Sequence, residues 1–119
     1  MAERVVLCGA NSYEQKYYFN KDFSLIPEDI KNEIHIISVL FTEDVGGIFT
    51  MVFDEEGRLQ LETQVADGDY LYDEISSRLL IGKITKTKQE LFRSLEMFYK
   101  VFILGMNIKD IESMESEED

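Results

Sequence analysis

The strongest constraint on the fold is a pair of strand-like runs around a short turn, at residues 48–65. Apolar and polar side chains alternate over residues 59–65, which is typical of a strand with one buried and one wet side. Residues 48–53 are apolar on both sides and are typical of a central strand. Between them, Gly57 can take the left-handed position that ends such a turn. The pattern predicts a β-hairpin.

A second hairpin is predicted near the N-terminus. Val5, Val6 and Leu7 form a short apolar run that is followed by a Gly-Ala-Asn-Ser cluster at residues 9–12. The next residues, 13–19, are rich in aromatic side chains. Two such runs around a turn cluster favour an antiparallel strand pair.

Residues 27–41 are predicted to form a helix. Pro27 suits a first turn, because its missing N–H would have no helical partner there. Ile30, Ile34 and Phe41 share one helical face. A central strand over residues 34–41 is the alternative, since buried strands are also continuously apolar. We favour the helix.

Another helix is predicted after the second hairpin. Asp67 or Asp69 offers its N-cap, and Gly82 offers its end. Its apolar stripe consists of residues at i, i+4 and i+8, namely Leu71, Ile75 and Leu79.

The last helix is predicted to begin at Thr87, because Thr87 and Glu90 have the spacing of a capping box. It extends to about residue 104, and its apolar arc includes Phe98 and Phe102. This arc is wider than one surface helix needs. The helix is therefore expected to pack across the sheet or to form part of a dimer interface.

The predicted order is β-β-α-β-β-α-α. This order is that of an α+β domain, with an antiparallel sheet of about four strands in two hairpins and about three helices largely on one face. Residues 1–106 form this single domain. Residues 107–119 carry a net charge of −5 and are predicted to be a disordered acidic tail.

Charge and composition restrict the partners and the compartment. The formal net charge is −12, so we expect neither nucleic acid nor an anionic membrane as a partner. Cys8 is the single cysteine, which excludes an intramolecular disulfide. No signal peptide and no membrane-spanning run is recognisable. These features predict a cytoplasmic protein.

Few side chains are suited to catalysis or to metal binding. Cys8 and His35 are the one pair from which a nucleophilic dyad could be built, but Cys8 is better explained as a small core residue and His35 as a satisfied or solvent-facing helix residue. The carboxylates of residues 67–74 depart from the calcium-loop pattern. Phosphate-binding glycine loops are absent from the sequence. We therefore expect no catalytic residues, no metal site and no cofactor.

Three blocks of sequence carry a resemblance to a known family. They are VLCGANSYEQKYYFN at residues 6–20, LFTEDVGGI at residues 40–48 and LYDEI at residues 71–75. Together with the last helix, they resemble a family of small uncharacterised bacterial proteins over most of residues 5–105. The resemblance implies a bacterial, cytoplasmic protein and brings no activity, cofactor or catalytic residue with it.

Aromatic side chains supply a candidate interaction surface. Tyrosine offers apolar area together with a polar group, which suits protein contacts. The candidates are Tyr13, Tyr17, Tyr18, Phe98 and Phe102. Packing within the strand face is the alternative for the tyrosines.

Three functions remain open on these grounds. The first is a non-enzymatic protein-interaction module that binds itself as a homodimer, or another protein. The second is a small-molecule-binding domain or enzyme with a pocket between sheet and helices, near Cys8, Tyr17 or His35. The third is an acidic inhibitor or chaperone for a basic protein.

Overall fold

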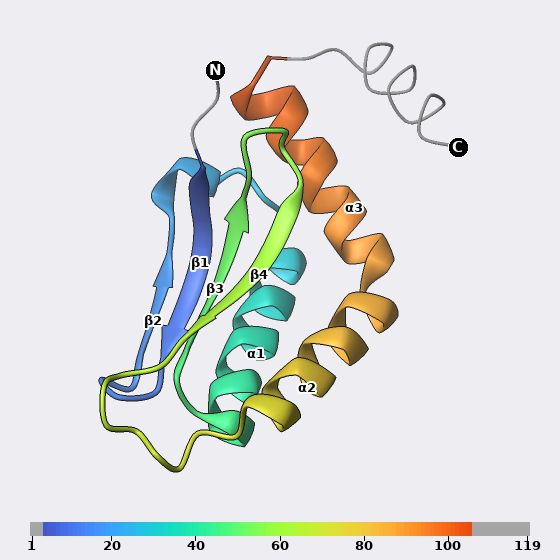
Figure 1. Ribbon diagram of the computed structural model, residues 1–119. Helices are drawn as coiled ribbons and strands as arrows, with labels where there is room; N and C mark the ends of the chain where they lie inside the picture. The colour runs from blue at the N-terminus through green and yellow to red at the C-terminus, as the bar shows by residue number, and fades with distance from the viewer. Residues whose placement is uncertain (1–3, 106–119) are drawn as a thin grey trace.

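The computed structural model describes residues 4–105, which form one antiparallel sheet with helices packed against it (Figure 1). The predicted α+β class and the order β-β-α-β-β-α-α are confirmed. The predicted acidic tail, residues 107–119, lies outside the described residues. The elements are β1 (Val5–Asn11), β2 (Lys16–Phe19), η1 (Lys21–Phe23), α1 (Glu28–Val45), β3 (Ile48–Phe53), β4 (Leu59–Gln64), α2 (Glu74–Thr87), α3 (Gln89–Phe98) and η2 (Tyr99–Ile103).

The sheet has the strand order β2-β1-β3-β4, so the two predicted hairpins join through the β1–β3 pair. All three pairings are antiparallel, and β2 and β4 are the edge strands. The three helices lie on one face of the sheet (Figure 1). Phe49, Met51 and Phe53 of β3 are fully buried, as expected for a central strand.

Residues 34–41, for which the sequence allowed either a helix or a central strand, are helical and lie inside α1. Its buried side chains, among them Ile34, Ile37 and Phe41, pack on the sheet. Ile36 and Leu40 point away from the core and are exposed. The helical periodicity, and not the continuous apolar content, therefore gave the correct reading.

A stack of aromatic rings joins the sheet to both of its flanking short helices. Tyr99 of η2 lies on Phe53 of β3 with ring centroids 4.3 Å apart and an interplanar angle of 4°. Phe23 of η1 packs against both rings, at 5.5 Å from Phe53 and 6.1 Å from Tyr99. Each such contact adds about 0.5–1.5 kcal/mol to the stabilisation from buried area. The stack fixes where the C-terminal end of the last helix meets the sheet.

The start and the end of α2 differ from the prediction. Its N-cap is Asp73, whose side chain accepts hydrogen bonds from the backbone N–H groups of Ile75 and Ser76, so the caps predicted at Asp67 or Asp69 are wrong. The helix also passes through Gly82 and ends at Thr87. Half-buried Ile84 lies beyond the glycine and packs against the core, so tertiary contact outweighs the low helix propensity of glycine.

The capping box predicted at the last helix is also wrong. Thr87 belongs to the end of α2, where its hydroxyl donates to the carbonyl of Lys83 at 2.8 Å. Lys88 separates the two helices, and its ammonium group lies 3.0 Å from the carboxylate of Glu33 on α1. This ion pair between distant segments helps to place the junction, and local sequence does not reveal it.

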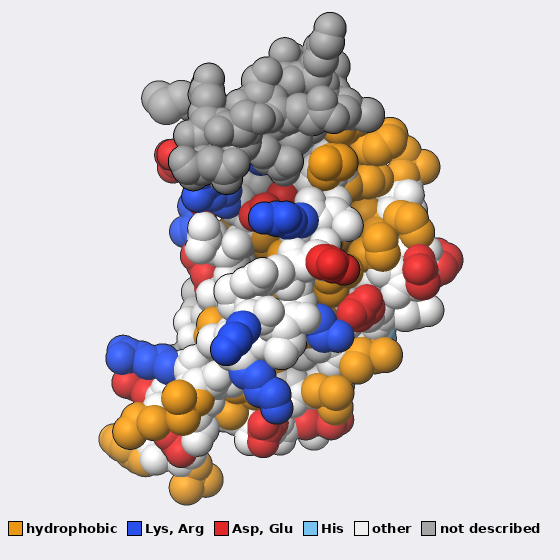
Figure 2. Space-filling model, turned by 90° about the vertical axis from the view of Figure 1, so that its right-hand side faces the viewer, with side chains coloured by type: hydrophobic (Ala, Val, Ile, Leu, Met, Phe, Trp, Pro, Cys, Tyr) orange, Lys and Arg blue, Asp and Glu red, His pale blue; other side chains and the backbone are white. Residues whose placement is uncertain are grey.

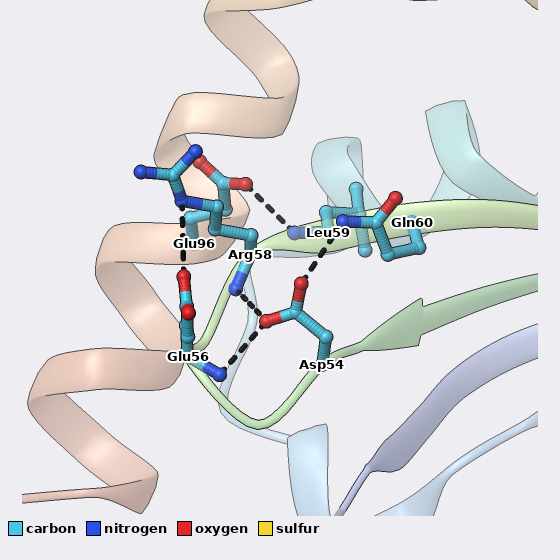
Figure 3. A network of polar contacts seen from close by, with 6 residues as sticks. All are labelled: Asp54, Glu56, Arg58, Leu59, Gln60 and Glu96. Carbon is cyan, nitrogen blue, oxygen red and sulfur yellow. Dashed lines mark hydrogen bonds and ion pairs between the residues drawn. The ribbon is translucent and has the colours of Figure 1, made fainter.

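The β3–β4 turn is held by one carboxylate and is docked on α3 by another (Figure 3). Asp54 accepts hydrogen bonds from the backbone N–H groups of Glu56 and Arg58 and from the side-chain amide of Gln60, at 2.9–3.0 Å. Glu96 of α3 accepts from the backbone N–H of Leu59 at 2.7 Å. Burial alone would raise the pKa of the Asp54 carboxyl, but these hydrogen bonds lower it below its ordinary value.

A glycine in a crowded place marks the start of β3. Gly47 has φ of +75°, and a Cβ there would lie 2.9 Å from both the carbonyl oxygen of Gln64 and the ring of Tyr72. No other residue fits this position without displacement. The α1–β3 connection is therefore pressed against the segment that leads into α2.

The variant Asp54→Asn should lower the free energy of unfolding by about 1 kcal/mol at pH 7, because it weakens the acceptor of the turn hydrogen bonds. The folded-state pKa of Asp54 is depressed. Its stabilising contribution is therefore present above the ordinary pKa of an aspartate and is lost as the pH falls through the lower folded-state value. Urea unfolding of wild type and variant at several pH values would measure the difference.

The matched control is Glu55→Gln, an exposed residue of the same turn, which should unfold like the wild type at pH 7. A deficit of Asp54→Asn that stays undiminished at the lowest pH would contradict the role given to the carboxylate.

Candidate functional site

The five aromatic residues predicted as an interaction surface do not lie together. Tyr13 lies in the β1–β2 turn, and Phe98 and Phe102 stack on each other at the opposite end of the sheet (Figure 1). Tyr18 is exposed on β2, paired with Gly9 on the sheet face away from the helices. Tyr17, its neighbour in the strand, points to the helix side. The single predicted surface is thus divided among separate places.

Tyr13 connects two loops that are distant in sequence. Its hydroxyl donates to the carboxylate of Asp69 at 2.6 Å and accepts from the backbone N–H of Ala66 at 3.0 Å. The hydrogen bond to Asp69 raises the pKa of the Tyr13 hydroxyl. Tyr13 therefore holds the loop between β4 and α2 against the first hairpin, and sequence alone did not reveal this positioning role.

A cleft of about 580 Å³ lies between the first hairpin and α1. One wall comes from β1, β2 and the turn between them, and the other comes from one side of α1. Its lining side chains are mostly polar, with one cationic and one anionic member. They are Ala10, Asn11, Ser12, Gln15, Lys16, Tyr17, His35, Val39, Thr42 and Glu43.

Two aromatic rings form the centre of the cleft. Tyr17 and His35 are stacked, with ring centroids 4.0 Å apart and an interplanar angle of 14°. The hydroxyl of Tyr17 reaches into the interior, where no hydrogen-bond partner among the described residues faces it with good geometry. Burial, and then the nearby Cys8 thiol, raise the pKa of this hydroxyl. The imidazole of His35 stays at the surface.

Cys8 of β1 lies next to the Tyr17 hydroxyl and is fully buried. Its sulfur lies 3.7 Å from the hydroxyl of Ser38, which itself donates to the carbonyl of Ile34 at 2.8 Å. Burial raises the pKa of the Cys8 thiol to about 11. Since the thiolate is the nucleophile, this environment favours an inert packing cysteine.

The carboxylates considered for metal binding serve the backbone. Asp73 caps α2, and Asp69 accepts from Tyr13 and from the backbone N–H of Leu71. Within residues 4–105, no three side chains of His, Cys, Asp or Glu are gathered as metal ligands would be. Over the same residues, no helix combines the length and the hydropathy that crossing a bilayer requires.

The apolar stripe predicted on the second helix is exposed. Leu71 is 96% exposed, Ile75 73% and Leu79 70%, and Tyr70 beside them is 95% exposed. The opposite side of α2, with Ser77 and three half-buried aliphatic residues, packs on the core. We call the four exposed side chains the α2 patch; they are Tyr70, Leu71, Ile75 and Leu79.

Charges of both signs flank the α2 patch: residues 67–74 carry four carboxylates and no basic side chain, and basic residues follow. Residues 75–105 carry six lysines or arginines and two glutamates, a net charge of +4 in a chain of −12. Figure 2 views the face formed by α2 and α3 and shows hydrophobic side chains in separate areas, with Lys and Arg side chains between them. The overall composition does not reveal this uneven distribution of charge along the chain.

The comparison with protein families gives one match. Residues 4–107 match the model of a family of unknown function, DUF6145. The chain belongs to this family. The predicted membership of an uncharacterised family is confirmed, and its predicted bacterial origin stays a prediction. Searches of curated proteins and of solved structures each found no match.

Cys8 should react slowly with a thiol reagent at pH 8 in the folded protein and at once in urea, because burial shields it and keeps it protonated. Release of thionitrobenzoate from a disulfide reagent measures both rates. The control His35→Ala should leave the slow rate unchanged. A fast native reaction that this variant slows would restore the Cys8–His35 dyad as a hypothesis.

Proposed function

We propose that this protein is a non-enzymatic interaction module that forms a homodimer through the α2 patch. The observation that carries the proposal is the exposure of Ile75 and Leu79 on one side of α2, at 73% and 70%, and of Leu71 just before the helix, at 96%, while the other side of α2 is already packed. Single exposed apolar residues are common, but neighbouring ones on one helix face mark a contact surface.

The free energy available at the α2 patch is adequate for association. Complete burial of one leucine or isoleucine side chain stabilises by about 1.5–3 kcal/mol. A twofold axis counts each residue twice, since the same surface serves both subunits. Four large side chains per subunit therefore supply a central apolar contact.

The distribution of charge favours a second copy as the occupant. Acidic residues precede and begin α2, including Asp67 and Glu74, and basic residues gather toward its end, including Lys83 and Lys86. In an antiparallel α2–α2 pair, the acidic end of each helix lies along the basic end of the other. The apolar residues Ile75 and Leu79 then lie between the two charged ends.

The cytoplasm is the compartment that we propose, and bacteria are the source. A single buried cysteine without a disulfide supports a reducing compartment, and the resemblance over residues 5–105 supports a bacterial source. A basic protein could also bind the acidic remainder of the chain, as in the inhibitor hypothesis, but charges of both signs flank the α2 patch and do not favour such a partner there.

The double variant Ile75→Gln/Leu79→Gln should weaken dimerisation at least about tenfold, because polar side chains replace the centre of the contact. Sedimentation velocity over a range of concentrations measures the dissociation constant. The matched control is Leu25→Gln, since Leu25 precedes α1, outside the α2 patch, and is 74% exposed. A wild-type chain that stays monomeric at high concentration would overturn the proposal.

Salt should weaken the dimer, because the charged ends of the paired helices are screened. Between about 0.05 and 0.5 M NaCl the wild-type dissociation constant should rise several-fold. The variant Lys83→Gln/Lys86→Gln should begin weaker and change less with salt. A wild-type dimer that tightens with salt would point to apolar contact without the antiparallel charge arrangement.

A further inference from the structure

A segment on the outside of the molecule is attached to the rest of it through one tyrosine. Residues 66–71, which we call the strap, follow β4 and pass beside the β1–β2 turn on the way to α2 (Figure 1). None of the strap side chains is buried, and none belongs to the hydrophobic core or to the half-buried side chains packed against it. Within residues 4–105, two hydrogen bonds join the strap to another segment, and the Tyr13 hydroxyl makes both.

These two bonds fix the strap near both of its ends. The Tyr13 hydroxyl accepts from the backbone N–H of Ala66 at 3.0 Å, at the start of the strap. It donates to one carboxylate oxygen of Asp69 at 2.6 Å. The other oxygen of Asp69 accepts from the backbone N–H of Leu71 at 3.1 Å. A chain of hydrogen bonds therefore runs from Tyr13 through Asp69 to the last residue of the strap.

The strap carries half of the α2 patch. Tyr70 and Leu71 belong to the strap, whereas Ile75 and Leu79 lie on α2 itself. The side chains of Tyr70 and Leu71 are 95% and 96% exposed, so packing does not hold them and the backbone hydrogen bonds decide where they lie. A loose segment would have to be ordered each time the dimer forms, and this ordering costs conformational entropy.

We infer that the Tyr13–Asp69 hydrogen bond is the latch of a conformational switch that controls dimerisation through the α2 patch. With the latch closed, the two strap residues of the patch are held in place and the contact surface is complete. With the latch open, the strap is loose and only the two patch residues on α2 keep their position. The inference rests on the proposed dimer, and it names how that contact is regulated.

Loss of the Tyr13 proton opens the latch. The phenolate has no proton to donate, and its negative charge faces the carboxylate of Asp69. Asp69 and Tyr72 are the titratable groups that act on the Tyr13 hydroxyl. The hydrogen bond to Asp69 raises the pKa of this hydroxyl. The contribution of the latch is therefore complete below the ordinary pKa of a tyrosine and is lost as the pH rises through the higher folded-state value.

Hydrogen exchange in a monomeric background tests the latch by itself. The variant Ile75→Gln/Leu79→Gln of the full chain removes the centre of the contact, and Tyr13→Phe is then added to it. We expect the backbone amides of Ala66 and Leu71 to exchange at least about fivefold faster at pH 7, because Ala66 loses its acceptor and Leu71 its fixed partner.

Sedimentation velocity then tests the control of dimerisation. Tyr13→Phe should weaken the wild-type dimer at least about fivefold. Asp69→Ala should have the same effect, while Asp69→Asn, which keeps an acceptor oxygen for the tyrosine, should recover most of the affinity. Above about pH 10, the wild-type dissociation constant should rise toward that of Tyr13→Phe, which lacks this step.

The matched control is Tyr18→Phe, because Tyr18 is an exposed tyrosine of β2 on the sheet face away from the helices. This variant should leave the dissociation constant and both exchange rates unchanged. Equal melting temperatures of Tyr13→Phe and Tyr18→Phe would show that both variants fold and that the change is confined to the strap.

Three results would overturn the inference. The first is exchange at Ala66 and Leu71 that Tyr13→Phe leaves unchanged, since the strap would then be held without the latch. The second is faster exchange together with an unchanged dissociation constant, since the strap would then not control the contact. The third is a wild-type chain that stays monomeric. That result would overturn the proposed dimer as well, and the exchange rates would still show separately whether Tyr13 holds the strap.

Discussion

The stack of Phe23, Phe53 and Tyr99 is the contact on which the arrangement of the molecule depends. It joins the central strand β3 to η1 before the first helix and to η2 after the last one. Lys88, just before α3, pairs with Glu33 of α1, and α2 packs its Ser77 side against the core. The exposure of the α2 patch follows from that placement.

Sequence patterns were sufficient for the fold where local chemistry decides the structure. The alternation at residues 59–65 and the periodicity of Ile30, Ile34 and Phe41 each reflect a single buried face, so the elements and their order could be read directly. The ends of the helices could not be predicted from local sequence. Gly82 did not end α2, because Ile84 beyond it packs against the core, and Thr87 did not cap α3, because its hydroxyl donates to the carbonyl of Lys83 within α2.

The sequence identified the apolar and aromatic side chains of the candidate surfaces, but it did not predict where they lie on the structure. Leu71, Ile75 and Leu79 have the spacing of a buried stripe, and spacing cannot say which face of a helix the sheet will cover. Similarly, Tyr13, Tyr17 and Tyr18 are adjacent in sequence, yet strand alternation and a turn send them to different surroundings. Cys8 is a buried core residue, as its apolar neighbours in the sequence predict, and His35 is exposed, with Tyr17 stacked on its imidazole.

Gly47 restricts which substitutions the protein can accept. The lack of a side chain lets Tyr72 lie against the backbone, and the Tyr72 hydroxyl then donates to Ser77 of α2 at 2.6 Å. Any residue larger than glycine would push away the tyrosine that seats the helix. A larger residue at position 47 would therefore disturb the contact that positions α2 and would also press on the backbone of β4 at Gln64.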